Sequence, residues 1–152
     1  MLENPQITTL DPQHTAVVRR TVPMDQIRDF YDTSFAAVAR AVAEQEVGVR
    51  GAIGHYLSTP TDTVELEAGV ITDGAITADG DVIPAELPGG EVAHATHVGP
   101  YDGLGSAWNE LYQWVLGQGR HVGEKMWEVY VTEPTPEVDP ATMRTDLFWP
   151  LV

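Results

Sequence analysis

The amino-acid sequence predicts an α+β fold in which a strand–helix–strand–strand module occurs twice. Segments with a period of two alternate with segments of helical period, and the order of these segments repeats at a spacing of roughly 70 residues. A turn-rich segment separates the two runs. One module alone would leave a face of its strands uncovered. Pairing of the two modules is therefore expected to bury that face and to leave a groove along their junction.

The first module is expected at about residues 5–72. Pro23 is tolerated in the first turn of a helix, and the residues after it carry apolar side chains at helical spacing until Gly48 marks a stop. The expected elements are a strand at 14–22 (HTAVVRRTV), a helix after Pro23, and strands at 52–59 (AIGHYLST) and 63–72 (TVELEAGVIT). The apolar helix positions are Ile27, Phe30, Tyr31, Phe35, Val38 and Val42.

Residues 73–89 are rich in turn-forming residues and are expected to connect the modules. Within them, Asp79-Gly80 is typical of the turn of a small hairpin. The second module is expected at about residues 90–152. Its elements are a strand at 90–99, a helix at 100–119 and strands at 125–133 and 143–152. The apolar face of its helix contains Leu104, Trp108, Leu111, Tyr112 and Val115.

Length and composition favour a single globular domain over residues 1–152. The chain has 43% hydrophobic residues and no cysteine, which excludes disulfides and thiolate metal sites. No apolar run is long enough to span a membrane, and MLENPQITTL lacks the pattern of a signal peptide, so a cytoplasmic location is expected.

The charge of the chain narrows the classes of partner. Eight basic residues stand against 23 acidic ones, which gives a net charge of −15, and Lys125 is the one lysine. Such a surface repels nucleic-acid phosphates and anionic membranes, so neither partner is expected. The acidity has two readings that are compatible with each other: a solubilising surface, and a field that attracts cationic ligands.

The segment KMWEVYVTE (125–133) raises the main question about function. A period of two places Trp127, Val129 and Val131 on one face of a strand and Glu128, Tyr130 and Thr132 on the other. Glu128 therefore either lies exposed on its strand or faces a polar-lined cavity. In a cavity, a carboxylate would favour a cationic or hydrogen-bond-donating ligand. Partial burial would also raise its pKa and suit it to acid–base chemistry.

Other chemical sites are not indicated. His94 and His97 lie three residues apart, so a strand points them to opposite faces, and the remaining histidines show no ligand spacing with them. The segment ELPGGE lacks the lysine and the helix of a phosphate-binding loop, and GLGSAWN is no nucleophile elbow. No metal and no cofactor are expected.

Four motifs in order resemble the GyrI-like domain, the effector-binding domain of AraC-type and multidrug-responsive regulators. They lie in HVGPYDGLGSAWNELYQWV, WEVYVTEP and RTDLFWPL. The first half is similar more loosely, through VRRTVPMDQIRDFYDTSF and VELEAGV. The motif residues are Gly99-Pro100-Tyr101, Leu111 with Trp114, Glu128-Val129-Tyr130, and Thr145 with Pro150.

This resemblance implies an antiparallel sheet with two main helices, built from two modules about a pseudo-twofold, and a ligand pocket at their junction. Glu128 would pair with lipophilic cations while aromatic rings stack on the ligand. The residues expected to line the pocket with it are Tyr130, Tyr101 and His97 from the second half and Tyr56 and Tyr31 from the first. For Tyr101 the alternative is a ring packed over its own helix. Trp108, Trp114 and Trp127 are expected in the core, and Trp149 suits either place.

Three functions are compatible with these observations. The first is a stand-alone protein that binds lipophilic, cationic or aromatic compounds in order to sequester or to sense them, since no helix–turn–helix segment precedes the first strand. The second is a hydrolase of electrophilic or strained-ring natural products, with Glu128 as the base and Tyr130 as the polarising hydroxyl. The third is an acidic inhibitor of gyrase, as the namesake of the family is. A protein partner or a homodimer is compatible with each.

Overall fold

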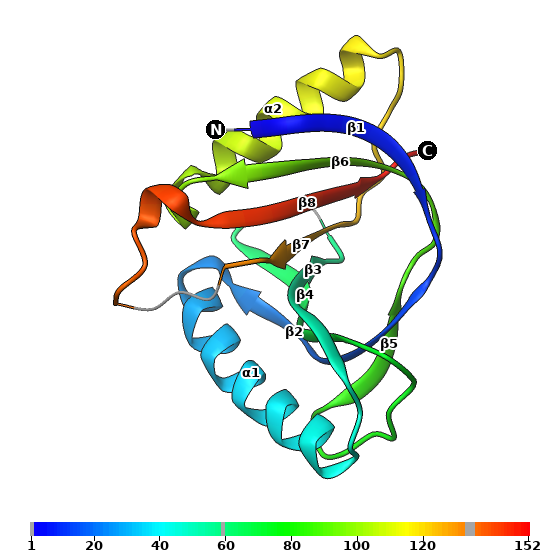
Figure 1. Ribbon diagram of the computed structural model, residues 1–152, viewed down its shortest axis with the longest axis vertical. Coiled ribbons are helices and arrows are strands. Elements are labelled where there is room, and N and C mark those ends of the chain that lie inside the picture. Colours follow the sequence, from blue (N-terminus) through cyan, green and yellow to red (C-terminus); the bar gives the residue numbers. More distant parts are fainter. Residues whose placement is uncertain (1, 59, 133–135) are drawn as a thin grey trace.

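The computed structural model describes residues 2–58, 60–132 and 136–152, and its eight strands form one antiparallel sheet. The strands are β1 (Leu2–Leu10), β2 (Gln13–Pro23), β3 (Val49–Tyr56), β4 (Thr63–Thr72), β5 (Ile83–Leu87), β6 (Gly90–Val98), β7 (Met126–Tyr130) and β8 (Arg144–Pro150). The helices are α1 (Ile27–Glu44) and α2 (Leu104–Gly117), with short 3-10 turns η1 (Met24–Gln26), η2 (Tyr101–Gly103) and η3 (Pro140–Thr142). Figure 1 shows their arrangement.

The predicted duplication is present in the element order. The series β2–η1–α1–β3–β4 is followed by β6–η2–α2–β7–β8, and the sheet order is β1-β6-β8-β7-β3-β4-β2-β5. The two modules therefore meet at the pair β3–β7, in which Gly54 lies opposite Glu128. The α+β fold class with two main helices is confirmed.

Both edge strands lie outside the elements that periodicity indicated. β1 pairs with β6 of the second module, and β5, within the expected connector, pairs with β2 of the first. Their sequences, LENPQITTL and IPAEL, contain prolines and lack a regular apolar alternation. Asp79 and Val82 form an isolated antiparallel bridge in the same connector, where the hairpin turn was expected.

Both helices pack on one face of the sheet, which we call the helix face. Val38, Ala41 and Val42 of α1 contact Ala16 and Val18 of β2. The corresponding face of α2 packs on β6 and β8, and its cluster includes Ala107, Leu111, Val115, Ala93, Ala95 and Leu147. The chain enters α1 through η1, which follows Pro23, and enters α2 through η2, which follows Pro100. The first turns of both helices lie over the β3–β7 junction.

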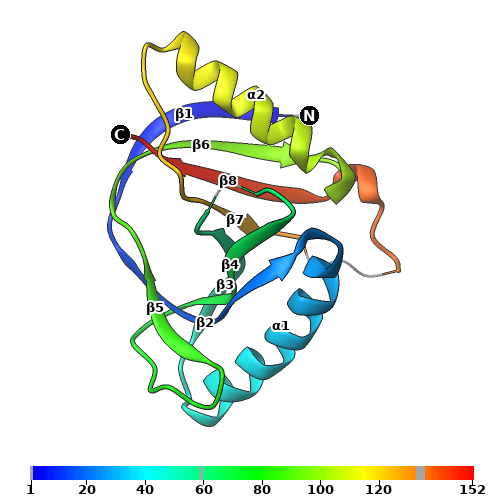
Figure 2. The same cartoon turned by 180° about the vertical axis from the view of Figure 1, so that it is seen from behind.

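The opposite face of the sheet, the reverse face, contains a core of its own. The sheet curves, and the ribbons β1–β2 and β5–β6 bend from one module to the other (Figures 1 and 2). Val17, Ile53 and Trp127 are fully buried there together with Leu87 and Val92. Each fully buried aliphatic side chain of this kind contributes roughly 1.5–3 kcal/mol. Of the helices among the described residues, none has the length and apolar character needed to cross a membrane.

Candidate functional site

A cavity of about 320 Å³ lies on the helix face where the two modules meet. We call it the junction cavity. Its walls come from both modules: η1 and α1 on one side, η2 and α2 on the other, and β3 and β7 beneath. The lining side chains include Met24, Ile27, Tyr56, Tyr101, Leu104, Trp108, Met126 and Glu128. Most of this lining is apolar, and Glu128 is its one formally charged side chain among the described residues.

Glu128 lies at the floor of the junction cavity and is only 3% exposed. The indole Nε1–H of Trp108 donates to its Oε1 over 2.9 Å, and the hydroxyl of Tyr130 donates to its Oε2 over 2.7 Å. The ion pairs among the described residues do not include Glu128. The carboxylate is therefore held by neutral donors, and no side chain in the described part of the chain supplies a cation to balance its charge.

Three tyrosine hydroxyls meet beside Glu128. The hydroxyl of Tyr31 lies 3.2 Å from that of Tyr130 and 3.3 Å from that of Tyr56. Tyr31 comes from α1, Tyr56 from β3 and Tyr130 from β7, so both modules contribute. A hydroxyl both donates and accepts, which lets the three groups satisfy one another and pass hydrogen bonds towards the carboxylate.

Gly54 makes room for these hydroxyls. It is the register partner of Glu128 on β3. A Cβ atom at position 54 would clash with the hydroxyl of Tyr31 and would lie 2.6 Å from that of Tyr130. The missing side chain on β3 therefore lets the tyrosines of α1 and β7 meet above the strand.

Burial raises the pKa of Glu128 above its usual value, although hydrogen bonds from Trp108, Tyr130 and Tyr56 partly offset this effect. Burial also raises the pKa of Tyr130 and Tyr56, and the nearby charge of Glu128 raises both further. The tyrosines are consequently hydrogen-bond donors throughout the physiological range.

The structure brings together five of the six residues expected at the site. Tyr31, Tyr56, Tyr101 and Tyr130 surround Glu128, and Tyr101 contacts the Tyr130 ring edgewise at 5.8 Å between centroids. Tyr101 is 37% exposed and lies at the mouth of the cavity. His97 lies apart from them: it is buried beneath η2, with Nε2 3.0 Å from the carbonyl oxygen of Pro100. The ligand-binding role of these six residues stays a prediction.

The role of Trp108 at this site differs from the one predicted from the sequence. Trp108 was expected in the core, and it is indeed 8% exposed, yet its indole also lines the cavity and binds Glu128. Trp127 is fully buried on the reverse face, as expected. A buried tryptophan needs an acceptor for its N–H. This requirement is the signal that could have linked Trp108 to a buried carboxylate. The described residues contain no cluster of histidine and acidic side chains that could hold a metal ion.

Comparison with solved structures finds the same fold in EcmrR. The C-terminal domain of EcmrR superposes with a TM-score of 0.85 at 18% identity, covering 100% of this chain and 99% of that one. In the EcmrR–DNA complex the TM-score is 0.82 at 18% identity, and the match covers 97% of this chain. The chain spans 57% of the length of that EcmrR chain.

Two more distant structures share the fold. SAV2435 bound to tetraphenylphosphonium matches with a TM-score of 0.69 at 13% identity, over 98% of this chain and 94% of that one. A hydrolase from Listeria innocua matches with a TM-score of 0.66 at 14% identity, over 99% and 92%. A comparison with curated proteins found no match. The family model for the GyrI-like small molecule binding domain matches residues 3–152, and the chain therefore belongs to that family.

Proposed function

We propose that the junction cavity binds a lipophilic cation, with Glu128 as its counter-ion. The observation that carries this proposal is a buried carboxylate whose hydrogen-bond partners are all neutral. An isolated buried charge is costly, and a ligand cation that reaches it supplies the missing opposite charge. Neutral donors hold the carboxylate in place without competing for that charge.

The walls of the cavity suit the apolar part of such a ligand. Tyr101 and Trp108 offer rings, and Met24 and Met126 offer flexible, polarisable side chains that adapt to different shapes. A cation over the face of such a ring gains about 0.5–2 kcal/mol per good contact. Met24 and Tyr101 are 42% and 37% exposed at the mouth, where a ligand would cover them.

Two further observations support a cationic ligand. The net charge of −15 attracts cations towards the whole surface and should speed their association at low salt. SAV2435, which shares the fold, was solved with tetraphenylphosphonium bound. That compound is therefore the natural first probe.

The test is a titration with tetraphenylphosphonium chloride, followed by calorimetry and by tryptophan fluorescence. Glu128→Gln keeps the shape and an acceptor for Trp108 but removes the charge. We expect it to weaken binding about 30-fold or more, since loss of one partner of a buried charge pair costs about 2–5 kcal/mol. Glu110→Gln, on the exposed face of α2, is the matched control and should leave the affinity unchanged.

A neutral probe separates charge from shape. Triphenylphosphine oxide has similar rings without the positive charge, and it should discriminate little between the wild type and Glu128→Gln. Equal affinity of tetraphenylphosphonium for both proteins would overturn the proposal.

One observation favours a second candidate, hydrolysis of a strained-ring electrophile. Glu128, with its raised pKa, lies 2.7 Å from the Tyr130 hydroxyl, which is the pairing of a base and a polarising donor. In such a step water attacks a ring carbon, Glu128 takes a proton from the water, and the ring oxygen that leaves as an alkoxide accepts a proton from the tyrosine hydroxyl. A fold neighbour is described as a hydrolase. Multiple-turnover loss of an epoxide that stops in Glu128→Gln would favour this function, and stoichiometric binding alone would eliminate it.

A further inference from the structure

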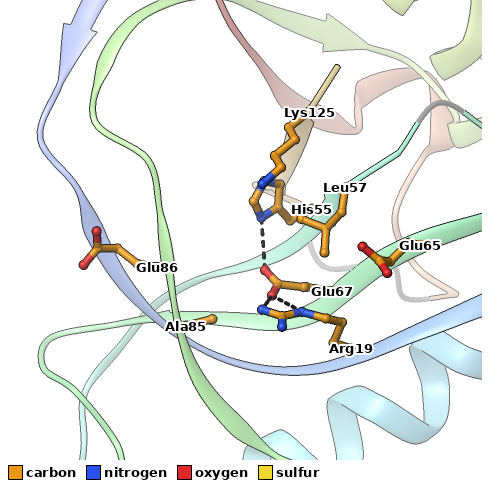
Figure 3. Close-up of a pocket in the computed structure, with 8 residues that line it drawn as sticks. All are labelled: Arg19, His55, Leu57, Glu65, Glu67, Ala85, Glu86 and Lys125. Atoms are coloured by element: carbon orange, nitrogen blue, oxygen red, sulfur yellow. Dashed lines mark hydrogen bonds and ion pairs between the residues drawn. The ribbon is translucent and has the colours of Figure 1, made fainter. Parts of the chain in front are cut away.

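A second cavity, of about 360 Å³, lies on the reverse face, on the other side of the sheet from Glu128. We call it the reverse-face cavity. It is lined by side chains of β2, β3, β4 and β5 and by Lys125, just before β7 (Figure 3). In contrast to the junction cavity, its lining consists mostly of ionisable side chains: Arg19, His55, Glu65, Glu67, Glu86 and Lys125.

Its floor is built by three strands in register. Arg19 on β2 lies opposite Glu67 on β4, and Glu67 lies opposite His55 on β3. The guanidinium of Arg19 donates from Nε over 2.8 Å and from Nη2 to Oε2 of Glu67, while Nδ1 of His55 lies 3.1 Å from Oε1. Burial alone would raise the pKa of Glu67, but the bonds from His55 and Arg19 outweigh it and lower that pKa. The Glu67 carboxylate is therefore ionised, and both of its oxygens accept hydrogen bonds.

The imidazole of His55 is left with one polar atom to be satisfied. Glu67 accepts from Nδ1–H, which fixes the tautomer of the neutral ring and makes Nε2 an acceptor. His55 is 3% exposed, and Nε2 has no hydrogen-bond partner among the described residues. Figure 3 shows the ring between Glu67 and the side chain of Lys125, within the cavity that both line. A buried acceptor without a partner costs about 1–3 kcal/mol, which a ligand that donates to it would recover.

The groups around His55 divide into two kinds. Lys125 and the Nη1 of Arg19 can only donate hydrogen bonds, while the carboxylates of Glu65 and Glu86 can only accept them. These groups have no partners among the described residues; Lys125, Arg19 and Glu65 face the same small volume, whereas the Glu86 carboxylate points away from it (Figure 3). A free anion would be repelled by the carboxylates, and a lipophilic cation would find few apolar side chains in this mostly polar lining.

Hydroxyl groups match such a lining, because each one donates and accepts. We propose that the reverse-face cavity binds a small neutral polyhydroxylated molecule, a sugar or a polyol, with a ligand hydroxyl donating to Nε2 of His55. Other hydroxyls accept from Lys125 and Arg19 and donate to Glu65. This site is separate from the junction cavity, and the proposal is independent of the function proposed above.

The experiment is a titration of the ¹⁵N-labelled full chain with D-glucose and with myo-inositol, followed by NMR of the backbone amides and of the His55 ring. We expect saturable shifts at residues of β3 and β4 that line the reverse-face cavity. Lys125→Met and His55→Phe should each weaken binding about tenfold, the effect of losing one charge-assisted or buried hydrogen bond. Arg40→Met, which removes an exposed cation of α1, is the matched control and should change nothing.

Lys125 is exposed, so Lys125→Met keeps the test decisive even if His55→Phe fails to fold. Tetraphenylphosphonium binding should be the same in Lys125→Met and in the wild type, which separates this outcome from that of the junction cavity. Glycine, a small zwitterion, serves as the competing class of ligand. The proposal is overturned by shifts with glycine alone, by no saturable shift at about 100 mM of either sugar, or by equal affinities in both variants and the wild type.

Discussion

Two glutamates, Glu128 on the helix face and Glu67 on the reverse face, are almost equally buried, at 3% and 2% exposure. Their surroundings differ in one respect. Glu128 accepts from Trp108 and Tyr130, which are neutral, whereas Glu67 accepts from the guanidinium cation of Arg19 as well as from His55. Burial raises the pKa of Glu128, and the partners of Glu67 lower its pKa despite burial. The identity of the donors therefore decides which acid keeps a charge available for a ligand and which one stabilises the fold.

The largest expected effect comes from crowding the donors of Glu128. In Gly54→Ala, the added methyl group would displace the hydroxyls of Tyr31 and Tyr130. We expect a loss of about 1–3 kcal/mol in the free energy of unfolding, as for other overpacked sites, and weaker binding of tetraphenylphosphonium. Urea denaturation and calorimetry measure the two effects.

Gly51→Ala on the same strand is the matched control. A Cβ atom there would lie 3.3 Å from Cγ1 of Val129, a contact that a small shift relieves. If the two variants lost stability and affinity to the same extent, the steric role of Gly54 would be refuted.

The next effect concerns Glu67. Glu67→Gln should lower the free energy of unfolding at neutral pH by about 1–2 kcal/mol, towards the low end for charge-assisted hydrogen bonds because Arg19 is half-exposed and can turn to water. The folded-state pKa is lowered, so the carboxylate stabilises the fold above the ordinary glutamate pKa, and this contribution is lost as the pH falls through the folded-state value. Denaturation curves across the acidic range should show the two proteins converging at low pH; a constant difference would contradict the assignment.

The smallest effect should have the opposite sign. For Glu128 the folded-state pKa is raised, so its contribution to stability is complete at low pH and is lost as the pH rises through that value. Glu128→Gln should therefore be more stable than the wild type at neutral pH, by about 0.5–1 kcal/mol, a common cost of a functional charge. Thermal denaturation at acidic and neutral pH checks the sign. A variant less stable than the wild type at neutral pH would show that the carboxylate is already balanced.

Much of the fold could be predicted from the chain, because apolar periodicity reflects burial on one face. It located both helices and the strands β2, β3, β4, β6, β7 and β8 to within a few residues. β1 and β5 were not predicted as strands, because edge strands are paired on one side only and carry mixed, half-buried side chains. Their assignment depends on partners far along the chain, which local patterns do not report.

Of the two candidate sites, one could be predicted from the sequence and the other could not. The alternation around Glu128 separated it from Trp127, and the tyrosines expected beside it do lie there. The cluster of Arg19, His55 and Glu67 was not anticipated, since each residue alone fits an exposed strand position. Only the register of three neighbouring strands brings them together. The signal available in the sequence was Glu67 itself, which stands between Leu66 and the small and apolar run AGVI of β4.

The pairing of β1 with β6 has a consequence for the order in which the protein acquires its structure during synthesis. β1 leaves the ribosome before its partner β6, which emerges only after the entire first module has been made. Until then β1 has an unpaired edge on both sides, which is a hazard for association between nascent chains. The polar and proline-containing sequence LENPQITTL limits that hazard. The same irregular pattern that prevented the prediction of β1 therefore also lowers its tendency to associate with other chains before β6 has been made.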